Sequence, residues 1–270
     1  MIYLSSFAIS DRKLRNPNIY PYSVFRTKYV EPIVFSPITV FYGSNGCGKS
    51  TLLNIIAQKL SLAGCETYAY GEKYMNEFTQ ECKFDLGENE QGYKNRIPGT
   101  GKYVKSEDVL FEIKKIQQEE ALERGYVYDL TRKGMSREKA EEKYHSSIGL
   151  NTITDILQFA QEKYSNGETA MQMLQDVMIP DTLLLLDEPE VSLSPQNQIK
   201  IAEEMNTLAR YCNSQFLVAT HSPFLLGTLQ AKIYNMDQQE IEECGWNELE
   251  NVKFFYDFFK KHQNDFETVQ

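Results

Sequence analysis

The stretch PITVFYGSNGCGKS, residues 37–50, begins with a β-branched and aromatic run that stops abruptly at Gly43. Apolar residues follow the glycines at helical spacing, at Leu52, Ile55, Ile56 and Leu60. Residues 37–60 are therefore predicted to form a strand, a glycine-rich loop and a helix. This order indicates an α/β core with the loop at the end of a strand.

Residues 43–50 fit the pattern G-x-x-x-x-G-K-[ST] at every position. Glycines let successive backbone N–H groups turn inward around phosphates, and the helix that opens at Gly48 adds its positive end. Lys49 would reach the β- and γ-phosphates, and the Ser50 hydroxyl would ligate Mg²⁺. The predicted nucleotide-binding residues are Gly43, Ser44, Asn45, Gly46, Cys47, Gly48, Lys49, Ser50 and Thr51.

A second predicted strand, residues 182–186, is an apolar run of the kind expected when both faces of a strand are buried. Asp187 and Glu188 follow it directly. At such a strand end one carboxylate can hold magnesium through water, while the next can orient and deprotonate an attacking water. A lone acidic pair is more often a solvated turn, so its assignment depends on the other motifs.

Two of those motifs have both a structural and a functional interpretation. Residues 165–168, Ser-Asn-Gly-Glu, form a capping box, and such a helix amino end can also receive a phosphate from a facing protomer. His221 follows the predicted buried strand 215–219. A lone histidine is more often structural, yet the carboxyl ends of parallel strands are where such sheets place active sites.

The order of phosphate loop, S-x-G-E, LLLLDEPE and THS resembles that of the ATP-binding-cassette (ABC) ATPase superfamily, over about two thirds of the chain. DEPE followed by LSP is similar to the soluble repair, OLD-like and antiphage-defence cassette ATPases more than to transporter subunits. The resemblance implies an α/β, ABC-type P-loop ATPase fold with a central mostly parallel sheet, antiparallel β elements near the N-terminus and a helical signature subdomain. It implies one domain, residues 1–270, with a polar insertion and helical lid or signature subdomain at about 66–180.

The resemblance also implies the roles of the site residues, with ATP and Mg²⁺ as cofactors. Asp187 would support Mg²⁺ together with Ser50. The implied catalytic residues are Glu188 as the general base, His221 at the γ-phosphate and Lys49 at the phosphates.

The signature motif would close over ATP bound to the other protomer of a head-to-tail dimer, through Ser165, Asn166, Gly167 and Glu168. It reads S-N-G-E rather than S-G-G-Q, which departs from the family pattern. A clear glutamine loop is missing, and its place is left open among Ser106-Glu107-Asp108, Gln117 and Gln118. The aromatic residue that stacks on adenine is left open among Tyr20, Tyr22 and Phe25.

The sequence therefore predicts an ATPase that hydrolyses ATP to ADP and phosphate in an ATP-dependent homodimer. It would couple hydrolysis to a separate effector protein, with antiphage defence as one setting by analogy. The alternatives are the nucleotide-binding subunit of a membrane transporter and a nucleotide-gated regulatory module with little turnover. The lack of an N-K-x-D motif disfavours a GTPase, and the lack of long heptad repeats excludes an ATPase with coiled-coil arms.

Composition and charge indicate which binding partners, structural links and cellular locations are compatible with the sequence. The net charge of −10 disfavours attraction of the whole molecule to nucleic acid or anionic lipid. A local basic surface is the alternative, around Arg12, Lys13, Arg15, Arg26 and Lys28. Five scattered cysteines argue against disulfides and structural zinc. With no signal sequence and no apolar run of about 18–20 residues, we expect a cytoplasmic chain without membrane insertion.

The first forty residues predict short strands joined by turns, in the pieces IYLSSFAI, YSVFRTKYV and PIVF. Residues 65–101 are predicted to be a polar, irregular excursion. Helices are predicted over most of residues 109–145 and over 152–161.

Ser194 and Pro195 are predicted to be the N-cap and the first residue of another helix. The segment 246–259 is unusually aromatic. The residues that give it this character and its helical spacing are Trp246, Leu249, Val252, Phe254, Phe255, Phe258 and Phe259. It is predicted to be a helix that closes the core, because aromatic stripes at helical spacing usually pack inward. The alternative is that part of it docks a partner protein.

Overall fold

The computed structural model describes residues 1–28, 31–66, 72–109, 111, 125–128, 130–132, 135–139, 143 and 166–267. Within these residues the larger sheet has six strands in the order β5-β6-β7-β3-β8-β9. They are β5 (Lys102–Lys105), β6 (Leu183–Asp187), β7 (Gln215–Ala219), β3 (Ile38–Tyr42), β8 (Lys232–Asn235) and β9 (Glu242–Glu243). The first five run parallel, and β9 pairs antiparallel with β8. The predicted α/β fold with a central, mostly parallel sheet is confirmed.

The smaller sheet of the described chain is antiparallel, with three strands in the order β2-β1-β4. These are β1 (Leu4–Ala8), β2 (Ile33–Val34) and β4 (Lys83–Leu86). Two of the three strands come from the first forty residues, so the prediction of antiparallel β elements near the N-terminus is confirmed.

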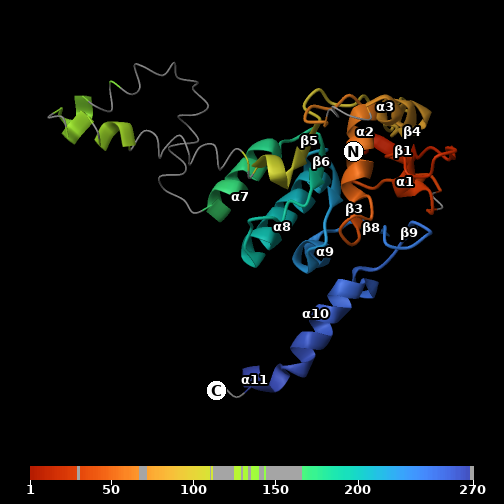
Figure 1. Ribbon diagram of the computed structural model, residues 1–270. Helices are drawn as coiled ribbons and strands as arrows, with labels where there is room; N and C mark the ends of the chain where they lie inside the picture. The colour runs from red at the N-terminus through yellow and green to blue at the C-terminus, as the bar shows by residue number, and fades with distance from the viewer. Residues whose placement is uncertain are drawn as a thin grey trace.

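Helices cover both faces of the larger sheet (Figure 1). They are α2 (Lys49–Lys59), α7 (Asn166–Val177), α8 (Pro195–Tyr211) and α9 (Pro223–Thr228). Leu183 and Leu185 of β6 lie in the cluster that contains α2, whereas Leu184 and Leu186 lie in the cluster that contains α7, α8 and α9. Side chains alternate between the faces of a strand, so a strand covered on both faces must be apolar at every position.

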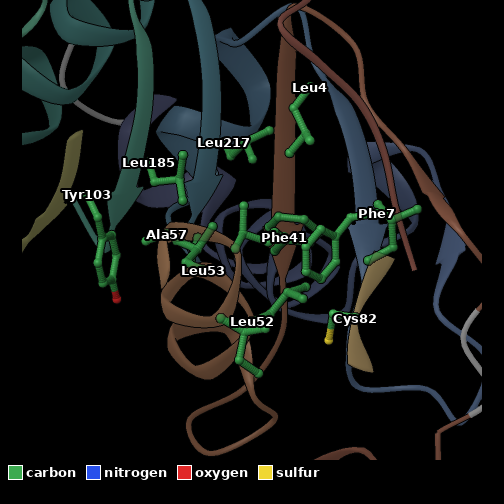
Figure 2. Packing of buried hydrophobic residues seen from close by; sticks show 14 of the residues in the cluster. Leu4, Phe7, Phe41, Leu52, Leu53, Ala57, Cys82, Tyr103, Leu185 and Leu217 are labelled. Carbon is green, nitrogen blue, oxygen red and sulfur yellow. The ribbon is translucent and has the colours of Figure 1, made fainter. Parts of the chain in front are cut away.

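The cluster on the α2 face also joins the two sheets. Figure 2 shows Leu185 and Leu217 of the larger sheet gathered with Leu53 of α2, while Phe41 lies between α2 and Phe7 of β1. All five side chains are fully buried. The phosphate loop therefore leaves a strand and enters a helix that are both fixed in the core.

Most elements around the motifs are confirmed. Strands β3, β6 and β7 and helix α2 lie where the apolar runs predict them. Ser194 caps α8, because its hydroxyl accepts a hydrogen bond from the N–H of Asn197 at 3.3 Å, and Pro195 is the first helical residue.

The strand predicted within YSVFRTKYV is wrong at its start, since Tyr22–Phe25 forms the short helix α1. Tyr22 and Phe25 are three residues apart and so lie on one helical face. Both pack on Phe78, Tyr22 edge-on with ring centroids 4.8 Å apart and Phe25 stacked at 5.7 Å. This aromatic contact decides the local conformation.

The irregular excursion predicted for residues 65–101 is wrong for residues 72–86, whereas residues 87–101 form neither a helix nor a strand. Helix α3 (Glu72–Glu81) buries Met75, Phe78 and Thr79, at the spacing of one helical face. β4 follows it and pairs with β1. The helices predicted at 109–145 and 152–161 lie largely or wholly outside the described residues, and the division at 66–180 stays a prediction.

The aromatic tail forms a 3₁₀ turn (Trp246–Glu248), α10 (Glu250–Lys261) and α11 (Gln263–Glu267), and α10 and α11 extend away from the sheets (Figure 1). Leu249 and Val252 are buried, as a core-closing helix requires. The aromatic residues of the segment are at least 41% exposed; they are Trp246, Phe254, Phe255, Tyr256, Phe258 and Phe259. The core-closing interpretation therefore holds only for the start of the helix. Within the described residues, no helix is both long and apolar enough to cross a membrane.

A buried amide side chain fastens the small sheet to the large one. Gln215 Oε1 accepts hydrogen bonds from the N–H groups of Tyr3 (2.8 Å) and Leu4 (2.9 Å). Its Nε2 donates to the carbonyl oxygens of Leu4 (2.8 Å) and Ser36 (3.2 Å). Gln215 thus satisfies four backbone groups where β1 meets β7.

We predict that Gln215→Leu lowers the free energy of unfolding by about 2–4 kcal/mol, because it leaves buried backbone groups without partners. Denaturant unfolding monitored by circular dichroism measures the change. The control is Gln172→Leu on the exposed face of α7, which should shift stability by less than about 0.5 kcal/mol. Equal effects of the two substitutions would contradict a bridging role for Gln215.

Candidate functional site

The phosphate loop connects β3 to α2 through backbone conformations that favour glycine. Gly46 has φ +83° and Gly48 has φ +107°. A Cβ atom at Gly46 would meet open space, whereas one at Gly48 would lie 2.5 Å from Val24 Cγ1. Glycine is therefore required at position 48 for two reasons: its backbone conformation is left-handed, and Val24 of α1 lies too close to leave room for a side chain.

Lys49 lies inside this loop and is 4% exposed. Its Nζ donates hydrogen bonds to the carbonyl oxygens of Gly43 (2.7 Å) and Ser44 (3.1 Å). The same atom lies 3.9 Å from Glu188 Oε1. A buried cation thus faces the acidic end of β6.

Two residues that the sequence analysis did not assign to the site brace the loop from outside. The Asp237 carboxylate accepts hydrogen bonds from Ser44 N at 2.8 and 3.0 Å and from Ser44 Oγ at 2.7 Å. Lys28 Nζ donates to the carbonyl oxygens of Cys47, at 2.6 Å, and Met236. Burial lowers the pKa of Lys28. The sequence feature that could have pointed to Asp237 is its position just after β8, because β8 is the parallel neighbour of β3.

Asp187 ends β6 and is buried beside the loop. Burial raises the pKa of its carboxyl group, and hydrogen bonds from the Ser50 and Tyr103 side chains oppose that rise. The Tyr103 hydroxyl donates to Asp187 Oδ2 at 3.1 Å. Within the described residues no hydrogen-bond donor reaches Oδ1. A buried carboxylate oxygen left open beside a serine hydroxyl fits the oxygen ligands that Mg²⁺ prefers.

Glu188 adopts a left-handed backbone conformation, with φ +50°. Such a conformation costs a non-glycine residue about 1–3 kcal/mol and is concentrated at functional sites. Its N–H donates to the carbonyl oxygen of Ala219 at 2.8 Å, which ties the turn to the end of β7. His221 Nδ1 lies 3.7 Å from Glu188 Oε1. The three predicted catalytic side chains, Lys49, Glu188 and His221, are therefore brought together.

A cavity of about 400 Å³ opens beside Lys49 and Glu188, and His221 is not part of its lining. Its lining comprises Asn45, Gly46, Gly48, Lys49, Ser50, Thr51, Lys105, Ser106, Glu107, Asp187 and Glu188. Ser106 and Glu107 belong to the first alternative for the glutamine loop, while Gln117 and Gln118 lie outside the described residues. Among the described residues of these open choices, Ser106 and Glu107 lie at the site.

The signature motif is only partly described. Ser165 lies outside the described residues, α7 begins at Asn166, and Glu168 is exposed. Glu168 does not line the cavity over the phosphate loop. Its predicted action on a facing protomer stays a prediction.

The aromatic candidates for adenine stacking separate clearly. Tyr22 and Phe25 are buried against Phe78. Tyr20 is 38% exposed, and its hydroxyl lies 3.2 Å from Thr51 Oγ1 at the start of α2. Tyr20 is therefore the member of the three that can present a ring face next to the loop.

Four of the five residues of the predicted basic surface, Arg12, Lys13, Arg26 and Lys28, line another cavity of about 470 Å³. Arg12 is paired with Glu81 at 2.5 Å and lies 3.8 Å from Glu77. Because Lys28 is bonded to backbone carbonyls, two of these four cations already have protein partners.

Comparison with known proteins identifies the family of this chain. The AAA-domain family described as "putative AbiEii toxin, Type IV TA system" matches residues 76–227, more than half of the chain. The chain belongs to this family. It is an ABC-type P-loop ATPase, as the order of its motifs predicts.

Curated relatives of this ATPase include transporter subunits. The energy-coupling factor transporter ATP-binding protein EcfA2 of Acetivibrio thermocellus is 23% identical over 206 residues, which cover 75% of this chain and 66% of that protein. The sn-glycerol-3-phosphate import ATP-binding protein UgpC of Cupriavidus metallidurans is 23% identical over 207 residues, covering 76% and 50%. The chain thus spans about half to two thirds of the length of these relatives.

Solved structures similar to this ATPase include a nucleotide-free ATP-binding cassette from an ABC transporter. It is 16% identical with a TM-score of 0.45, over 93% of this chain and 95% of that one. The Smc head domain from Pyrococcus furiosus, bound to the C-terminal domain of ScpA, is 13% identical with a TM-score of 0.45, over 96% and 100%.

The two glycines of the phosphate loop give a test of its geometry. We predict that Gly46→Ala costs about 1–2 kcal/mol of backbone strain. Gly48→Ala should cost about 1–3 kcal/mol more, because the new methyl group overlaps Val24. Thermal and denaturant unfolding measure both. In a Val24→Ala background the extra cost of Gly48→Ala should disappear, and its persistence there would show that the contact with Val24 is not the cause.

Proposed function

We propose that this ATPase hydrolyses Mg²⁺-ATP at the cavity between the phosphate loop and the end of β6, and that it does so as a head-to-tail dimer. The observation that carries the proposal is the convergence of Lys49 Nζ and His221 Nδ1 on one carboxylate oxygen of Glu188, at 3.9 and 3.7 Å. A cation, a base and a histidine that lie together at one edge of the sheet are the groups that phosphoryl transfer to water needs.

Each side chain has a distinct task in this proposal. Ser50 and Asp187 would hold Mg²⁺, which when bound neutralises charge on the phosphates. Lys49 would leave the carbonyl oxygens of its own loop and bind the β- and γ-phosphates. Glu188 would orient a water molecule and accept its proton, and His221 would contact the γ-phosphate. Tyr20 is the aromatic residue that we expect beside the adenine.

The assignment of Glu188 as the base predicts a separation of binding from turnover. Glu188→Gln should retain ATP and lose at least about 100-fold in kcat, because an amide cannot accept the proton of the attacking water. Lys49→Ala should lose nucleotide binding itself, since the cation that faces the phosphates is gone. Steady-state phosphate release and equilibrium binding of labelled ATP measure the two effects. The control is Glu203→Gln on the exposed face of α8, and Glu188→Gln with wild-type kcat would remove Glu188 as the base.

If the chain forms a head-to-tail dimer, a bulky side chain at the signature motif should prevent dimerisation. In the Glu188→Gln protein, ATP should shift the chain from monomer to dimer in size-exclusion chromatography with light scattering. Adding Ser165→Arg should abolish the shift while one ATP still binds each chain, because the arginine would block closure at the shared site. Glu203→Arg is the control for added charge. A dimer that survives Ser165→Arg would confine Ser165 to helix capping.

Coupling to a separate effector in a defence or toxin-like system stays a prediction. The family description supports it, since it names a putative toxin of a toxin–antitoxin system. The exposed aromatic side chains of α10 support it as well. Asn251 at the start of α10 donates a hydrogen bond to the carbonyl oxygen of His221, so this helix touches the site.

The second candidate function is that of a transporter's nucleotide-binding subunit, which the similarity to EcfA2 and UgpC favours. A transporter subunit would co-fractionate with membranes through a membrane-embedded partner. Our first proposal instead places the chain in the soluble fraction, so fractionation of the native cell separates the two. The third interpretation, a nucleotide-gated module, would show ATP binding with very slow turnover in the wild-type chain.

A further inference from the structure

Glu190 is a buried acid to which the mechanism above gives no task. It is 8% exposed and lies in the turn after β6, two residues beyond Glu188. Its Oε1 accepts hydrogen bonds from Thr220 Oγ1 at 2.6 Å and from His221 N at 3.0 Å. Burial raises the pKa of Glu190, and these hydrogen bonds oppose the rise. Burying a carboxyl group is costly unless it is hydrogen-bonded or paired with a charge.

The same oxygen faces the ring of His221, with Nδ1 at 3.5 Å. The His221 side chain is 50% exposed, so tight packing does not fix the orientation of its ring, and polar contacts must do so. A carboxylate beside Nδ1 favours a proton on that nitrogen. Nε2 on the opposite side of the ring is then the atom available to a ligand.

His221 is also held from the other side. The Asn251 side chain donates to its carbonyl oxygen, and the Asn251 N–H donates to the Tyr42 hydroxyl at 3.3 Å. The backbone N–H and C=O of His221 therefore each have a fixed partner. With the backbone held at both groups, the ring is oriented by its side-chain contacts, in which Nδ1 lies 3.5 Å from Glu190 Oε1 and 3.7 Å from Glu188 Oε1.

We propose that Glu190 is a positioning residue for His221: it anchors the N–H of His221 and directs the imidazole ring so that Nε2 faces the γ-phosphate. The inference rests on the proposed role of His221 in hydrolysis. It adds a third acid of the DEPE sequence to the site, after Asp187 and Glu188, with a task different from that of Glu188. Glu188 acts on water, whereas Glu190 acts only through the histidine.

A double-mutant cycle tests this inference. Glu190→Ala should lower kcat at least tenfold and change the KM for ATP by less than about threefold, because the phosphate loop is untouched. Glu190→Gln keeps an oxygen acceptor for Thr220 and His221 N but loses the charge, so its kcat should lie between those of Glu190→Ala and the wild type. In a His221→Ala background, Glu190→Ala should cause no further loss. Glu203→Ala on the exposed face of α8 is the control.

A second tenfold loss in the His221→Ala background would overturn the inference, because Glu190 would then act independently of the ring. Wild-type turnover by His221→Ala would instead refute the proposed role of His221, and the inference would fail with it. The chain has three histidines, so ring ¹⁵N spectra can be assigned by comparison with His221→Ala. Glu190→Gln should change the Nδ1–H population of His221 even if Glu190→Ala does not fold, and unchanged spectra would overturn the inference.

Discussion

The parallel pairing of β5, β6, β7, β3 and β8 is the constraint on which the site depends. In register, Phe41 lies opposite Ala219, and Ala219 lies opposite Asp187. The three strands therefore end at the same level of the sheet. The phosphate loop, the acidic turn and His221 begin immediately beyond it, although they are far apart in the chain. Carboxyl ends of parallel strands meet at one edge, which makes that edge the natural place for a site.

Strands β5 and β8 also end at this edge of the sheet, and they bring residues that belong to no recognisable motif to the site. Lys105 pairs with Asp187, so Ser106 and Glu107 leave β5 beside the Asp187 carboxyl group. Asn235 pairs with Tyr42, so Asp237 leaves β8 beside the phosphate loop. Each acid acquires its place from the register of its strand.

The site concentrates features that reduce stability, and the sheet offsets them. Lys49 and Asp187 are buried ionisable groups, and Glu188 has a strained backbone. These groups lie at the ends of strands whose apolar side chains are buried on both faces. Burial of that area, at about 25 cal/mol per Å², supplies the stabilisation that lets the strained edge persist.

The sequence by itself determined the strand–loop–helix at residues 37–60, the strands that end at Asp187 and Ala219, and the family. Those features depend on local patterns: continuous apolar runs, glycine spacing and turn residues. The tertiary structure alone decided that Tyr22–Phe25 is a helix, because its partner Phe78 is distant in sequence. It also decided that Asp237, Tyr103 and Glu190 contact the site and that most of the aromatic residues of α10 stay exposed. Local patterns carry no record of which distant side chain meets which, since strand register and the faces of helices arise only when the sheet assembles.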